Sequence, residues 1–85
     1  MIGIYPDACD VAAAVRGEMA GHRLGARVVA ERAGLSYGVV LDRVMGRVPF
    51  QLDQLVAVAG VLGMSLSEIV SRAEECAVRQ VVRTH

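Results

Sequence analysis

Eighty-five residues with nine basic and nine acidic side chains give a formal net charge of zero, so no overall positive charge marks the chain as a nucleic-acid binder. Hydrophobic residues make up 54% and aromatic residues 4% of the sequence, a balance that favours closely packed helices in one small domain, residues 1–85, over a β-sandwich. No membrane-spanning helix is expected, because the longest uncharged stretch, 54–67, is shorter than the ~20 residues that cross a bilayer.

The first predicted helix covers residues 8–20. Asp7 and Asp10 stand at its start, where carboxylates suit the unpaired N–H groups and the positive pole of a helix. Its apolar positions recur every fourth residue, at Val11, Val15 and Met19. Gly21 then interrupts the pattern, which predicts the end of the helix.

Two short helices are predicted next, at residues 26–33 and 37–45. Gly34 is expected to end the first, because glycine adopts the left-handed conformation at little cost. Ser36 is placed to cap the second. The apolar stripes are Val29, Ala30 and Ala33 in one helix and Val40, Leu41 and Val44 in the other. This spacing predicts a tight corner between two helices.

Two further helices are predicted at residues 52–62 and 66–82. Phe50 is placed to pack on Leu55 across the start of the first of them. The segment Ser65-Leu66-Ser67-Glu68 has the spacing of a capping box at the start of the second. The expected common core of the domain consists of Val29, Ala30, Val40, Leu52, Leu55, Ala59, Leu62 and Ile69.

The last predicted helix carries more apolar surface than a small domain can cover. Val78, Val81 and Val82 lie beyond its first three turns, in a helical extension expected over residues 77–85. Exposed apolar stripes on a helix commonly pack against a partner. These valines are therefore candidates for contacts within a homodimer, with a frayed tail as the alternative.

Little in the sequence points to catalysis or to a bound cofactor. Cys9 and Cys76 form no CxxC pair and His22 and His85 are isolated, so no metal site is expected. In a reducing compartment both thiols are expected to be small apolar fillers rather than a disulfide. Without a His–carboxylate pair or a phosphate loop, neither an enzyme nor a small-molecule ligand is expected. The amino end lacks the basic segment of a secretion signal, which predicts a cytoplasmic location.

Charge is distributed unevenly along the chain. Residues 1–15 carry −2, residues 16–47 carry six arginines against three acids, and residues 48–85 carry −1. The basic excess therefore falls on the two short helices and their surroundings.

Three segments carry a resemblance to a known family. LGARVVAERAGLS covers the second helix and the turn, YGVVLDRVMGRVP the third helix and its exit, and LDQLVAVAGVLGMSLSEIV the fourth helix and the start of the fifth. In this order and spacing, across residues 24–70, they resemble the Cro/repressor-type (XRE-like) helix-turn-helix family. The resemblance implies an all-α, lambda-repressor-like domain of five helices, with the third helix in the major groove of double-stranded DNA.

The resemblance also implies which side chains face the bases. The positions that usually do so are occupied by Tyr37, Gly38, Val39 and Asp42. Glycine and valine offer close approach or contact with a thymine methyl group, and aspartate accepts a hydrogen bond from cytosine. Tyr37 has the alternative of packing on the second helix.

Arg43 stands where the family usually has a buried aliphatic residue. A slightly rolled helix that buries Val40 and Val44 would turn Arg43 outward and add a cation to the groove. Arg43 and Arg47 are accordingly expected to lie exposed beside the third helix. The alternative for Arg43 is an ion pair with Asp42 or Glu31 on a solvated face.

Contacts with DNA phosphates are assigned to side chains that flank the helix pair. The candidates are Arg23, Arg27, Ser36 and Arg47. The alternative is equally open for each arginine, because surface arginines without such a role are common. For Ser36, the helix cap is a structural role whatever else it does.

Two functions follow from these observations. The first is a small phage or bacterial transcriptional regulator, repressor or Cro-like, that binds specific DNA as a homodimer. The second is a helix-turn-helix fold used as a protein-interaction module with weak or no DNA binding and a host or phage protein as its partner. The first is the function predicted here, and the neutral charge, the unusual base-facing residues and the apolar tail support the second as the alternative.

Overall fold

The computed structural model describes residues 6–84 of the chain, and the side chains of residues 6–79. Within that part the chain forms helices and no strands. The helices are α1 (Ala8–Gly21), α2 (Ala26–Ala33), α3 (Tyr37–Val44), α4 (Leu52–Val61) and α5 (Leu66–Thr84). The predicted all-α domain of five helices is therefore confirmed, and every predicted helix end lies within two residues of the observed one.

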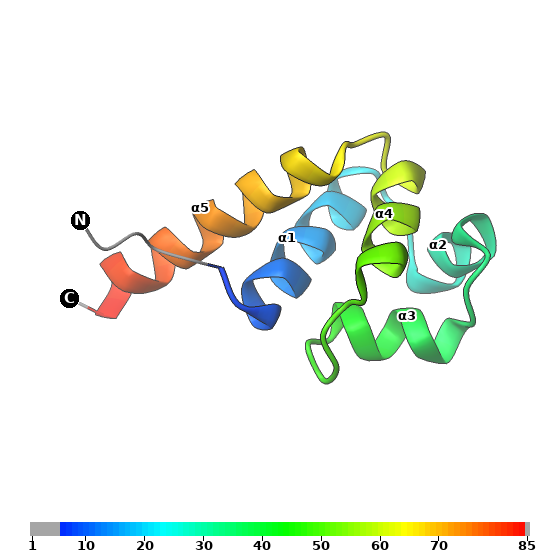
Figure 1. Ribbon diagram of the computed structural model, residues 1–85, viewed down its shortest axis with the longest axis horizontal. Helices are drawn as coiled ribbons and strands as arrows, with labels where there is room; N and C mark the ends of the chain where they lie inside the picture. The colour runs from blue at the N-terminus through cyan, green and yellow to red at the C-terminus, as the bar shows by residue number, and fades with distance from the viewer. Residues whose placement is uncertain (1–5, 85) are drawn as a thin grey trace.

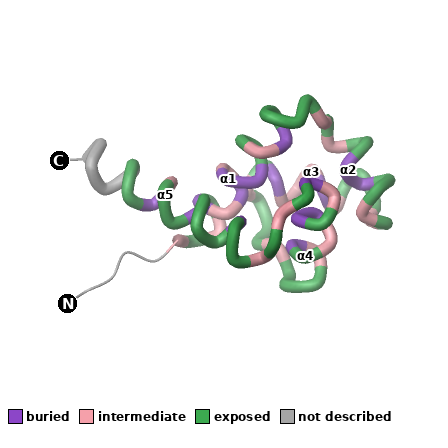
Figure 2. The backbone as a smooth tube through the Cα atoms, turned by 90° about the horizontal axis from the view of Figure 1, so that it is seen from above, coloured by how far each residue is buried: buried purple, intermediate pink, exposed green. Residues whose placement is uncertain are grey.

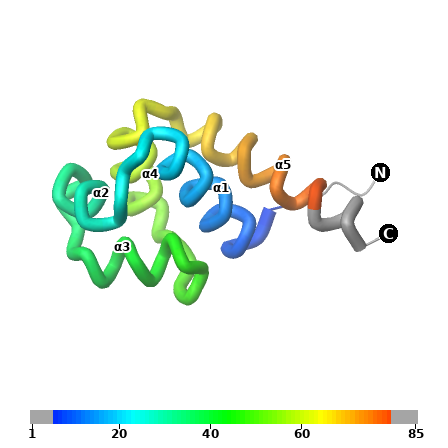
Figure 3. Tube along the Cα trace, turned by 180° about the vertical axis from the view of Figure 1, so that it is seen from behind, coloured from blue at the N-terminus to red at the C-terminus, as the bar shows by residue number. Residues whose placement is uncertain are grey.

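The helices form two groups joined by α4. In Figure 1, α1 runs beside α5 while α2 and α3 lie together at the other end, and the contacts between elements agree. The view from behind in Figure 3 shows the same pairing, with the coloured part of α5 extending past α1. Because the chain bends by 98° between α4 and α5, α5 is directed away from α3.

Side chains of α1 tie the two groups together. Arg16 donates a hydrogen bond from Nη1 to the carbonyl oxygen of Val44, the last residue of α3. Carbonyl groups at a helix end have no partner within the helix, and a cation there also suits the negative pole. On the other side of α1, Glu18 Oε1 lies 3.3 Å from Nε of Arg72 on α5. One helix thus contacts both α3 and α5 through polar side chains.

A capping box begins α1. Asp10 donates its backbone N–H to Oδ1 of Asp7, and Asp7 donates its backbone N–H to Oδ2 of Asp10, each over 2.9 Å. The bond from the Asp10 backbone is the main cause that lowers the pKa of Asp7. The carboxylate of Asp10 is buried, and the hydrogen bond that its Oδ2 accepts from the Asp7 backbone supplies the partner that a desolvated carboxylate needs.

A second capping box begins α5, as the sequence predicts. Ser65 Oγ accepts from the backbone N–H of Glu68 over 3.2 Å, and Glu68 Oε1 accepts from the backbone N–H of Ser65 over 3.0 Å. The bond from the Ser65 backbone lowers the pKa of the Glu68 carboxyl group. The start of α5 is therefore determined by four consecutive residues.

The core lies where α1, α4 and α5 meet the inner sides of α2 and α3, as Figure 2 shows by burial. Seven of the eight predicted core residues are buried, namely Val29, Ala30, Val40, Leu55, Ala59, Leu62 and Ile69. The prediction is wrong for Leu52, which is 66% exposed, while Val58 is fully buried. At 100° per residue, Leu52 lies about 120° around α4 from Val58, on the side away from the core.

The cysteines differ in their surroundings. Cys9 is exposed and Cys76 is half-buried, and neither forms a disulfide. The expectation that Cys9 fills apolar space is therefore wrong, because residue 9 lies at an exposed position in the first turn of α1. The described residues also contain no single helix that is both long and apolar enough to cross a membrane; α4 and α5 meet the two criteria only together, as a pair bent by 98°.

Candidate nucleic-acid interface

The corner between α2 and α3 is built by two residues with different tasks. Gly34 has φ +71°, the left-handed conformation, and its N–H and that of Leu35 bond back to carbonyl groups in the last turn of α2. Ser36 then accepts a hydrogen bond at Oγ from the backbone N–H of Val39 over 3.2 Å. Both predictions are confirmed, and together they place the first turn of α3 at the surface.

One side of α3 faces the core and the other faces solvent. Val40 and Val44 are 0% and 4% exposed, so the expected burial of these two valines is confirmed. On the opposite side, a line of three residues spaced by one turn consists of Gly38, Asp42 and Met45. We call these three residues the reading stripe. Gly38 and Met45 are exposed and Asp42 is half-exposed, so the stripe is open to a ligand.

Arg43 does not lie exposed beside α3, contrary to the prediction. It is half-buried, and its Nε donates to Oε1 of Gln54 in the first turn of α4 over 3.2 Å. The same Gln54 oxygen accepts the backbone N–H of Gln51 over 3.0 Å. One amide oxygen thus caps α4 and holds the guanidinium of Arg43. This partner is neither Asp42 nor Glu31.

Arg47 is exposed, as predicted, and it contacts the reading stripe. Its Nη1 lies 3.3 Å from Oδ1 of Asp42, with the two side chains 59% and 44% exposed. Exposed ion pairs contribute only about 0 to 1 kcal/mol. Arg47 can therefore leave Asp42 for another anion at small cost.

Tyr37 packs on the second helix. Cζ of Arg27 on α2 lies 4.2 Å from the centroid of the Tyr37 ring, within the range of a cation–π interaction. Tyr37 is still 39% exposed. The contact therefore joins α2 to α3 and leaves part of the ring at the surface.

Arg23 lies in the link between α1 and α2. It is exposed and has φ +56°, the one non-glycine residue with positive φ in the described chain. Such a conformation costs about 1 kcal/mol or more for a residue with a Cβ atom. The structure therefore holds Arg23 at the surface in a strained link, close in sequence to α2.

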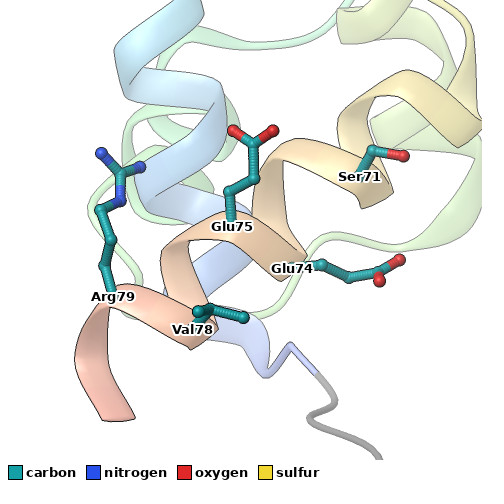
Figure 4. A pocket seen from close by; sticks show the side chains of 5 residues that line it. All are labelled: Ser71, Glu74, Glu75, Val78 and Arg79. Carbon is teal, nitrogen blue, oxygen red and sulfur yellow. The ribbon is translucent and has the colours of Figure 1, made fainter. Parts of the chain in front are cut away.

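The outer face of α5 carries a shallow hollow of about 510 Å³. It is lined by Ser71, Glu74, Glu75, Val78 and Arg79, all from α5 (Figure 4). Val78 is 44% exposed. We call the five lining residues the α5 hollow. Val81 and Val82, the other candidate dimer contacts, lie outside the residues whose side chains are described.

Several residues that shape this end of the molecule are not among the predicted site residues. Gln54 and Arg16 were not singled out, although the Gln51-x-x-Gln54 spacing of a capping box could have drawn attention to Gln54. Large apolar side chains that are exposed around the α3–α4 loop were missed as well, namely Met45, Val48, Leu52 and Val56. In the sequence, Leu52 belongs to the expected common core.

Solved structures share this arrangement of helices. A crystal structure of the clp gene regulator ClgR from Corynebacterium glutamicum matches with a TM-score of 0.85 at 23% sequence identity, over 91% of this chain and 82% of that one. A second ClgR crystal structure from the same organism matches with a TM-score of 0.72 at 26% identity, over 78% of this chain and 86% of that one. No protein-family model and no curated protein sequence matches the chain. The predicted fold, an all-α helix-turn-helix domain, is confirmed, whereas membership of the XRE-like family stays a prediction.

Proposed function

We propose that this protein is a DNA-binding transcriptional regulator that places α3 in the major groove. The observation that carries the proposal is the reading stripe, which is exposed on the second helix of a helix-turn-helix corner. An α-helix presented in this way fits the major groove, with its first turn toward the bases. The ClgR structures support the proposal, because that protein is named as a gene regulator and shares the fold over most of both chains.

Phosphate contacts come from arginines around the corner. Arg23, Arg27 and Arg47 are all exposed, and each belongs to the segment with the basic excess. Phosphate oxygens form strong, charge-assisted hydrogen bonds with guanidinium groups. In this proposal Arg47, whose side chain is 59% exposed beside Asp42, also contacts a phosphate, and Ser36 serves mainly as the cap of α3.

The regulator works as a homodimer that meets through the outer face of α5. A single stripe of Gly38, Asp42 and Met45 makes few base contacts, so specific binding needs two copies about one DNA turn, roughly 34 Å, apart. A two-fold interface must be complementary to itself. When two α5 helices pair in opposite directions, Glu75 of one copy faces Arg79 of the other near Val78, which meets this requirement.

The salt dependence of duplex binding tests the proposal. Fluorescence anisotropy with a labelled duplex of random sequence is expected to show binding that weakens steeply with salt, because phosphate contacts release counterions. Arg47→Ala is expected to lower the slope by about one contact, with a similar loss for all sequences. The matched variant Arg47→Lys retains the charge and is expected to retain most of the slope. Absence of binding to any duplex at low salt would refute the proposal.

A second function is favoured by one group of observations. Arg43 is turned toward Gln54, Asp42 and Arg47 neutralise one another, and large apolar side chains such as Met45 and Leu52 are exposed nearby. A surface of this kind suits a protein partner better than a polyanion. Retention of a partner protein from lysate after nuclease treatment, combined with no duplex binding, would support this function instead.

A further inference from the structure

The reading stripe holds one strong hydrogen-bonding side chain. Glycine has no side chain to offer, and the thioether of methionine is only a weak acceptor. Between Gly38 and Met45 stands the carboxylate of Asp42, one turn from each. A ligand that approaches the stripe therefore meets a hydrogen-bond acceptor flanked by groups with no donors.

The other polar side chains around α3 are already engaged. Arg43 donates to Gln54, Ser36 accepts from the backbone of Val39, and the ring of Tyr37 lies against Arg27. These contacts hold Arg43 toward α4, the Tyr37 ring against α2 and the Ser36 oxygen at the end of its own helix. Within the reading stripe, Asp42 is then the residue whose side chain can form a strong hydrogen bond with a base.

The geometry around Asp42 leaves room for a base. Oδ1 is paired with Arg47 at 3.3 Å, and Oδ2 makes no hydrogen bond within residues 6–79. One turn earlier, a Cβ atom added to Gly38 would meet nothing within 4 Å. A base edge can therefore approach the backbone at Gly38 while Oδ2 of Asp42 stays free to accept.

We propose that Asp42 selects a cytosine by accepting the amino hydrogen that N4 presents in the major groove. This inference rests on the proposed function of α3 as the recognition helix. An ionised carboxylate only accepts hydrogen bonds, so its partner must be a donor, which in the major groove means cytosine N4 or adenine N6. Adenine also presents the acceptor N7 beside N6, which repels the carboxylate, whereas cytosine has no such acceptor.

Arg47 makes an acidic base reader compatible with DNA. A lone carboxylate in the groove is repelled by the phosphates on both sides. The guanidinium of Arg47 screens that charge at Oδ1 and, being 59% exposed, is free to contact the adjacent phosphate. The two residues act together, with Asp42 selecting the base and Arg47 compensating its charge.

Selection from a library of random duplexes tests the inference. The wild-type protein is expected to enrich sites with a cytosine at one position of each half-site, preferred roughly tenfold over the other bases. Asp42→Asn is expected to change the preference at that position alone from cytosine to adenine, because asparagine pairs with both N6 and N7 of adenine. The matched control is Asp53→Asn, the same chemical change at an exposed position of α4, which is expected to select the wild-type site.

A second measurement uses the wild-type protein alone. N4-methylcytosine, in which a methyl group replaces the amino hydrogen facing the major groove, is placed at the selected position. Binding is expected to fall roughly tenfold there and to stay unchanged when the modified base is placed outside the half-sites. An unchanged affinity, or an Asp42→Asn variant that selects the wild-type sequence, overturns the inference while duplex binding persists. Enrichment of no sequence by a wild-type protein that binds no duplex overturns the proposed function, and this inference with it.

Discussion

The outer side of α3 and the outer face of α5 are both exposed helix surfaces, but they are constructed differently. Polar side chains at α3 are held by other elements, as Arg43 is by Gln54 on α4 and Tyr37 by Arg27 on α2. In the α5 hollow, all lining residues belong to α5 itself. A surface held by its neighbours is preorganised for one ligand, whereas a face without contacts to other elements is free to pair with a second copy.

Removal of the far part of α5 is expected to have the largest effect on function. A chain truncated after residue 77 should stay folded, because Ala77 is the last buried residue described on α5, and should become monomeric. Its affinity for a two-half-site duplex is then expected to fall by roughly 100-fold or more, since the second head no longer binds intramolecularly.

Sedimentation of the full-length and truncated chains measures this change. Val78→Glu is the matched point variant, because it places a charge beside Glu74 and Glu75 without shortening the helix. A full-length chain that sediments as a monomer at high concentration would contradict the proposed dimer. It would also contradict the expectation that the outer face of α5 pairs with a second copy.

Because the two surfaces differ in burial, replacing a valine on α3 and one on α5 is expected to change the stability of the protein by different amounts. Val40 on α3 is fully buried and Val78 on α5 is 44% exposed. Val40→Ala is expected to lower the free energy of unfolding by about 2 kcal/mol, from lost burial and the cavity that remains. Val78→Ala should change it by less than about 0.5 kcal/mol in the monomer. Urea denaturation at low protein concentration checks both values. Equal losses of unfolding free energy in the two variants would contradict the expected difference between Val40 and Val78.

Two glycines at the α2–α3 corner are expected to have opposite effects on stability when each is replaced by alanine. Gly34→Ala is expected to cost about 1 to 2 kcal/mol of stability, because φ is +71° there. Gly38→Ala is expected to stabilise α3 by about 0.5 to 1 kcal/mol, since a Cβ atom at Gly38 meets nothing and alanine favours helix. Thermal unfolding of the two variants gives the signs. Weaker DNA binding by the more stable Gly38→Ala variant would show that the base needs the space.

The smallest expected effect concerns the start of α5. The pKa of Glu68 is lowered from 4.5 by the hydrogen bond from the Ser65 backbone, so the folded state binds this proton less readily than the unfolded chain. The contribution of Glu68 to stability is therefore complete above pH 4.5 and is lost as the pH falls through the lowered pKa. Glu68→Gln retains a capping side chain and does not titrate. Unfolding curves between pH 3 and 7 are expected to show a weaker pH dependence for this variant.

Local sequence signals are sufficient to place the helix ends to within two residues. The two capping boxes, Asp7 with Asp10 and Ser65 with Glu68, and the left-handed Gly34 act between residues a few positions apart. Interactions of such short range depend only on local backbone geometry. For the same reason the burial of Val40 and Val44 on one side of α3 could be predicted from their spacing.

The way those helices present their side chains depends on how the elements pack on one another. The turn of Arg43 toward Gln54, the bond from Arg16 to the end of α3, and the exposure of Leu52 all depend on which element lies beside which. Periodicity distinguishes the apolar face of a helix from its polar face. It does not predict the partner of a long flexible side chain at the edge of the apolar face, because that partner depends on which element packs nearby. Arg43 therefore turns toward Gln54, and Asp42 is left as the polar side chain on the exposed side of α3, because α4 begins where it does.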